Sequence, residues 1–98
     1  MFTGTLAVDL LLGDVRSLKE KRSVVRPIVA ELQRRYSVAA AEVGHQDLYR
    51  RAAVGVAVVS ADAGHCREVL AACERLVAAR PEIELLSARQ RLYREEDE

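Results

Sequence analysis

Apolar side chains recur with two different periods along this chain, and the order of those periods leaves few possible folds. Residues 2–12 alternate with a period of two, as in a β-strand. Ser17 and Glu20 then form a capping box, in which the hydroxyl accepts from an amide of the first turn and the carboxylate returns to the cap. A helix is therefore expected to begin near Leu18, and its apolar stripe extends to Tyr36.

The second half of the chain continues this arrangement. Period-two patterns predict strands at residues 38–42 and 53–59. A second helix begins after a cap at Ser60 or Asp62, and a proline stops it before a fourth strand at about residues 83–92.

Strand, helix, strand, strand, helix, strand in this order is the ferredoxin-like βαββαβ plan. Right-handed crossovers place both helices on one face of a four-stranded antiparallel sheet, which predicts an α+β fold with one bare sheet face. Strand 53–59 is apolar on both sides, so both of its faces should be covered. We therefore expect a homodimer that forms through the open sheet face.

Pro27 conflicts with the first predicted helix. It removes the hydrogen bond to the carbonyl of Ser23, and a proline inside a helix costs about 3 kcal/mol. A kink or a loosened first segment is expected at this point.

Length and composition exclude several classes of protein. The 98 residues, half of them apolar, are enough for one hydrophobic core, and we expect a single domain over residues 1–94 with a frayed acidic tail at residues 95–98. No apolar run approaches the ~20 residues of a membrane span, and no signal-peptide pattern follows Met1. A cytoplasmic protein that does not bind membranes is expected.

The cysteines do not indicate a disulfide or a metal site. Cys66 and Cys73 lie seven residues apart in a helical pattern, which separates their Cα atoms by about 10 Å, beyond the limit of ~7 Å for a bridge. They are expected to be buried thiols. A metal site that joins His45 to His65 and Cys66 is not expected, because the second helix begins at the opposite end of the sheet. No metal or other cofactor is predicted.

Positive charge is concentrated in the first helix, although the chain has fifteen basic and fifteen acidic residues in all. Residues 16–35 carry seven basic side chains against two acidic ones. Such a face can be merely solvated, with the stems of lysine and arginine covering apolar surface, or it can bind RNA or another polyanion. The candidate anion- or RNA-binding residues are Arg16, Lys19, Arg22, Arg26 and Arg50.

The predicted topology brings the start of the first helix and the loop between the second and third strands to one rim of the molecule. Arg80, at the end of the second helix, is expected there too. The free amides and the dipole of the helix favour phosphate or carboxylate groups at this rim.

The loop itself is rich in titratable side chains, and its candidate functional residues are Glu42, His45, Gln46 and Asp47. A carboxylate beside the imidazole of His45, from Asp47 or Glu42, can set its tautomer for general base catalysis, but the same arrangement can simply fasten a loop. No nucleophile, metal-ligand set or phosphate loop accompanies it. No catalytic residue is therefore assigned.

Three motifs resemble the YlxP-like family, a bacterial group with a domain of unknown function. They occupy residues 16–25, residues 41–48, and residues 51–52 with 55–60, and read RSLKEKRSVV, AEVGHQDL, and RA with GVAVVS. The resemblance implies a small dimeric ferredoxin-like protein, and it supplies no catalytic residue. Genes of this family often lie among those for transcription termination, translation initiation and ribosome maturation factors.

These observations favour a non-enzymatic accessory protein of translation or ribosome maturation that binds RNA or a ribosomal partner through the basic helix and the adjacent rim. A dimeric module that binds an anion or metabolite at the rim is the main alternative. A hydrolase that uses His45 is the weaker one.

Overall fold

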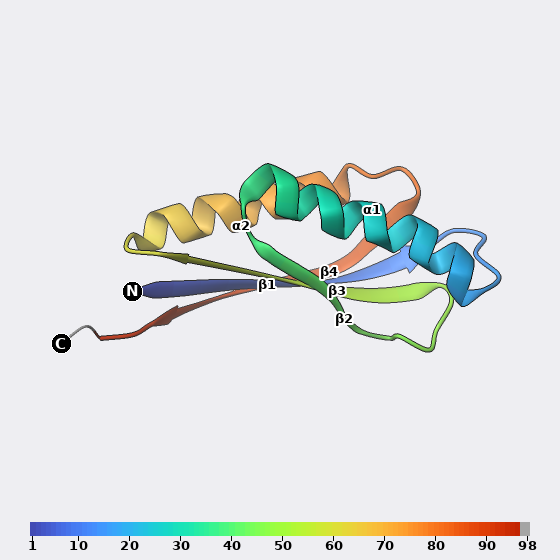
Figure 1. Cartoon of the computed structure of the whole chain (residues 1–98), viewed down its shortest axis with the longest axis horizontal. Helices are drawn as coiled ribbons and strands as arrows, with labels where there is room; N and C mark the ends of the chain where they lie inside the picture. Colours follow the sequence, from blue (N-terminus) through green and yellow to red (C-terminus); the bar gives the residue numbers. More distant parts are fainter. Residues whose placement is uncertain (97–98) are drawn as a thin grey trace.

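A computed structural model describes residues 1–96, and Asp97 and Glu98 of the expected acidic tail lie outside the described residues. The elements, in chain order, are β1 (Phe2–Leu12), α1 (Leu18–Tyr36), β2 (Ala39–Gly44), β3 (Arg51–Ser60), α2 (Ala63–Ala78) and β4 (Ile83–Arg94). The strands form one antiparallel sheet in the order β2-β3-β1-β4. Both helices lie on the same side of this sheet (Figure 1). The ferredoxin-like α+β prediction is confirmed.

The core lies between the sheet and the helices because β1 alternates as its sequence predicts. Leu6, Val8, Leu10 and Leu12 are buried and face the helices, whereas the intervening residues lie on the other, open face. β1 lies between β3 and β4 in the sheet. Its buried side chains therefore belong to the same hydrophobic core as the buried side chains of β3 and of both helices.

The start of α1 is a variant of the expected capping box. The amide of Glu20 donates to Ser17 Oγ over 3.1 Å, as predicted, but the Glu20 carboxylate accepts from the amide of Arg16 over 2.9 Å instead of from that of the cap. The expected loosened first segment is absent, because the helix is continuous on both sides of Pro27. Pro27 and Ser23 are exposed, so the carbonyl that lacks a helical donor is not trapped in the core.

Asp62, one of the two predicted caps, begins α2 by accepting a hydrogen bond from the amide of Gly64 over 3.0 Å. Both cysteines are free and buried, as predicted. Burial raises the pKa of the Cys73 thiol, because a thiolate would lose its hydration there. Within residues 1–96, no group of three or more His, Cys, Asp or Glu side chains could hold a metal ion.

The ladder between β1 and β4 reaches into the expected tail. The amide of Glu95 donates to the carbonyl of Met1 over 2.8 Å, so this residue continues the pairing. The start of the acidic segment therefore lies beside the N-terminus.

None of the helices in the described part of the chain combines the length and the apolar character needed to cross a membrane.

Candidate functional site

Three basic side chains form a row along the exposed side of α1. Lys19, Arg22 and Arg26, here called the basic row, occupy positions i, i+3 and i+7, so they share one side of the helix with axial steps of about 4.5 and 6 Å. Among residues 1–96, none of the three side chains makes an ion pair or a hydrogen bond. Together with Ser23 and Pro27 they line a shallow hollow. Their charge is available to a partner.

The other two predicted anion-binding residues are engaged in contacts within the chain. The guanidinium of Arg16 lies 3.3 Å from Asp14, and Arg50 Nε donates to the carbonyls of Leu12 and Gly13 over 3.3 and 2.9 Å. The Arg16 pair lies within the turn between β1 and α1, and the Arg50 hydrogen bonds fasten this turn to the neighbouring hairpin.

The connection that follows α2 reaches the end of β1, since Ile83 pairs with Leu12, but the side chain of Arg80 is held in ion pairs within the chain. Arg80 pairs with Glu31 over 2.9 Å and with Glu82 over 3.3 Å. Glu31 belongs to the second half of α1, so this pair ties the end of α2 to a part of α1 well away from its start.

Lys21 is the buried anchor of the hairpin. Only 2% of its side chain is exposed, and its ammonium donates to the carbonyl of His45 over 2.6 Å and lies 2.8 Å from Glu42 Oε2. The same carbonyl accepts from the amide of Leu48 over 3.0 Å. His45 has a φ of 58°, in the left-handed region that non-glycine residues rarely adopt. We attribute this conformation to the hydrogen bonds that hold its carbonyl.

The imidazole of His45 points to the opposite face of the sheet. Its Nε2 lies 3.4 Å from Asp9 Oδ1, and Arg51 donates to Asp9 Oδ2 over 2.7 Å. The carboxylate beside the imidazole is therefore that of Asp9, not that of Asp47 or Glu42 as the sequence suggested. Glu42 lies on the helix-covered face, because side chains alternate along β2.

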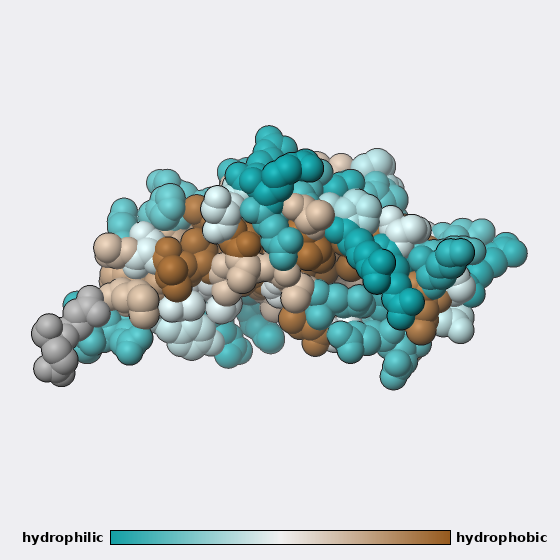
Figure 2. Space-filling view, in the orientation of Figure 1, coloured by the Kyte–Doolittle hydropathy of each residue, from teal (hydrophilic) through white to brown (hydrophobic). Residues whose placement is uncertain are grey.

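Two adjoining hollows form a furrow between α1 and the edge strand β2. One, of about 320 Å³, is lined by Arg22, Val25, Arg26, Val29, Ala30, Gln33 and Glu42. The other, of about 390 Å³, is lined by Leu18, Lys21, Arg22, Glu42, Gln46 and Asp47. Arg22 and Glu42 border both, and Gln46 and Asp47, the remaining predicted loop residues, lie at the polar end. Figure 2 shows hydrophobic surface between hydrophilic side chains where α1 lies above β2.

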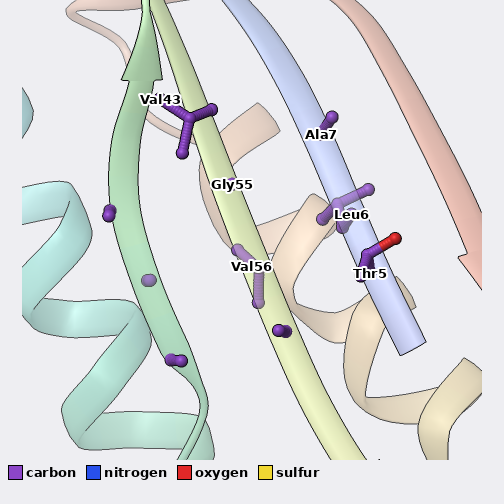
Figure 3. Close-up of a pocket in the computed structure, with 10 residues that line it drawn as sticks. Thr5, Leu6, Ala7, Val43, Gly55 and Val56 are labelled. Carbon is purple, nitrogen blue, oxygen red and sulfur yellow. The ribbon is translucent and has the colours of Figure 1, made fainter. Parts of the chain in front are cut away.

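The open sheet face carries a different surface, a shallow apolar trough. Thr5, Ala7, the alanines of β2, Val43, Gly55 and Ala57 line it (Figure 3). The side chain of Val43 lies across Gly55, where an added Cβ would be 3.0 Å from Val43 Cγ1. The helices lie behind the sheet in this view. Small side chains leave this part of the sheet accessible.

The fold and these contacts define a small ferredoxin-like α+β protein with an exposed cationic helix and a lysine-anchored hairpin. The chain belongs to the DUF503 family, described as proteins of unknown function, whose family model matches residues 3–90. It is 32% identical over 81 residues to the uncharacterized protein YlxP of Bacillus subtilis (strain 168). The aligned region covers 83% of this chain and 88% of the relative. The predicted resemblance to the YlxP-like family is confirmed.

Among solved structures, the chain is similar to a mutant of SnoaB, described as a cofactor-independent oxygenase from Streptomyces nogalater. The TM-score is 0.53 with 14% identity, over 98% of this chain and 95% of that one. At this identity the likeness shows the fold alone.

Proposed function

We propose that this protein is a non-enzymatic accessory factor of translation or ribosome maturation that binds RNA through the basic row of α1. The observation that carries the proposal is that Lys19, Arg22 and Arg26 share one exposed helix side and have no carboxylate partner within the described residues. Basic side chains without internal partners can release counterions from a phosphate backbone, which is the main source of sequence-independent affinity for nucleic acids. The gene context of the YlxP-like family supports the link to translation.

The described acidic residues near the C-terminus, Glu95 and Glu96, lie far from the start of the helix. Glu95 pairs with Met1 at the start of β1, whereas α1 begins beyond the far end of that strand (Figure 1). Eleven residues of β1 span about 36 Å, several times the Debye length of about 8 Å at physiological salt. The described acidic residues Glu95 and Glu96 are therefore screened from the start of the basic row.

Replacing both Arg22 and Arg26 with glutamate should abolish measurable RNA binding. With three phosphate contacts, the unmodified protein should lose about 20-fold in affinity for single-stranded RNA between 50 and 200 mM salt, since the slope is about −0.7 per contact. Fluorescence anisotropy with a 16-nucleotide RNA measures both effects, and co-sedimentation with bacterial ribosomal subunits tests the larger partner.

The matched control reverses two other exposed arginines, Arg67 and Arg75 on α2, which also have no ion-pair partner within residues 1–96. This control should bind RNA almost as the unmodified chain does. Equal losses in both double variants, or binding without salt dependence, would contradict a role for the basic row.

A homodimer through the open sheet face belongs to the same proposal. The trough there is apolar. Val43, which lines it, is 61% exposed, and Val59, two positions beyond Ala57 on the same side of β3, is 63% exposed. A second copy would cover this surface and leave the basic row on the outside of each sheet–helix layer.

Replacing Ala57 with glutamate should convert this dimer to a monomer, because a charge would be buried in an apolar contact without a partner. Light scattering after size-exclusion chromatography measures the mass, and circular dichroism confirms that the variant is folded. A monomeric unmodified chain at 100 µM protein, a concentration at which ~1 µM affinity would give dimers, would rule the dimer out.

A further inference from the structure

We infer that the RNA is single-stranded and that one of its bases enters the furrow between α1 and β2. This inference rests on the proposed RNA binding and adds where and in what form the RNA is held. Two of the three cations of the basic row, Arg22 and Arg26, also line the furrow. A strand whose phosphates contact the row therefore passes the opening of the furrow.

The furrow has the chemistry that a base requires. Val29 and Ala30, beside the buried Val25, provide an apolar surface, and every base has an apolar face that can lie against it. Guanidinium groups such as those of Arg22 and Arg26 can stack on the exposed side of a base. Each hollow exceeds 300 Å³, within the range of roughly 300–1,000 Å³ that is typical of small-molecule sites.

The polar end of the furrow provides hydrogen-bonding groups for the edge of a base. The amide of Gln46 can both donate and accept, and the carboxylate of Asp47 can accept. Neither side chain makes a hydrogen bond or an ion pair within the described residues. Lys21 holds the adjacent carbonyl of His45, so the loop that presents these groups is fixed to α1.

A duplex does not fit this surface. Paired bases remain stacked, and the major groove of A-form RNA is too deep and narrow for side chains to read. Only an unpaired base can turn away from its neighbours and enter a hollow beside a helix. A duplex could contact the basic row but not the furrow.

The edge of β2 argues against the other occupant of such a furrow, an added peptide strand. Gln33 Nε2 donates to the carbonyl of Ala40 over 3.0 Å, which occupies a group that an incoming strand would need. The pairing of β2 with β3 also shifts register between Glu42 and Gly44. Such irregularities interrupt an edge and oppose strand addition.

A substitution that fills the furrow should distinguish a single strand with a base in the furrow from a duplex that contacts only the basic row. Ala30 is exposed and lines the hollow, and leucine is a good helix former, so Ala30→Leu fills space without changing charge. We expect this variant to bind a 16-nucleotide single strand about tenfold more weakly, as for the loss of one base contact. Binding to the corresponding 16-base-pair duplex and the salt dependence should be unchanged. Ala78→Leu, at an exposed alanine of α2, is the matched control.

The two proposals fail in distinguishable ways. If single strand and duplex bind equally and Ala30→Leu changes neither, the furrow is not a base site, although the basic row still binds RNA. Equal weakening of both by Ala30→Leu also overturns the furrow. If neither RNA binds at 50 mM salt, the proposed function fails and the furrow with it. Photo-crosslinking of a 4-thiouridine strand should modify residues 25–33 of the unmodified chain, and adducts confined to other segments would contradict the inference.

Discussion

Replacement of Lys21 with methionine is expected to lower the free energy of unfolding by about 3 kcal/mol, at the lower end of the range for breaking a buried ion pair. The variant leaves the His45 carbonyl without its ammonium donor and Glu42 without its countercharge. Lys21 is almost completely buried, whereas Glu42 is 24% exposed and can recover part of its hydration, which places the cost at the lower end. Urea denaturation followed by circular dichroism measures the change.

Two variants test whether the ion pair causes this loss. Lys19→Met removes a basic residue from the exposed side of the same helix and should change stability by no more than about 0.5 kcal/mol. Lys21→Met combined with Glu42→Leu removes both charges, so it should be more stable than Lys21→Met alone. Equal instability of the single and double variants would show that the lysine acts through packing instead of charge.

The fold could be predicted from the sequence because its elements depend on local patterns. The period-two alternation of residues 2–12 gives β1 its buried face, and the capping residues Ser17 and Asp62 give the helices their starts. The local rule for a proline inside a helix was less successful. This rule predicted a kink or a loosened first segment at Pro27, but the segment before Pro27 is helical, and Val25 and Ile28 on either side of it are buried in the core.

The hairpin contacts could not be predicted in the same way because they join residues far apart in the sequence. The sequence suggests that the carboxylate beside His45 comes from the same hairpin. In the structure the imidazole instead lies beside Asp9, which belongs to β1. One signal was available for Lys21. It precedes the buried residues Val25 and Ile28 by four and seven positions, so it occupies the core stripe of α1. A lysine there needs a partner, and the pattern alone does not say which.

Leu70→Ala is expected to cost about 2–5 kcal/mol, because Leu70 is 1% exposed and its removal leaves a cavity between α2 and the sheet. The cavity would lie against Gly4, where an added Cβ would be 2.8 Å from Leu70 Cδ1 and 3.2 Å from Cys66 Cβ. Gly4→Ala alone should therefore overpack this contact and cost about 1–3 kcal/mol.

The double variant that combines both substitutions tests the contact between α2 and β1 more directly than either single variant. In Gly4→Ala with Leu70→Ala, the new methyl group enters the space that the leucine vacates, so the double variant should lose at least ~0.5 kcal/mol less than the sum of the single losses. Val77→Ala provides the control, since Val77 is also buried but lies about 10 Å farther along α2. Its loss should add to that of Gly4→Ala within about 0.5 kcal/mol. Additive losses for the pair with Leu70 would mean that α2 does not approach β1 closely at Gly4, and the packing described for this end of the sheet would then be wrong.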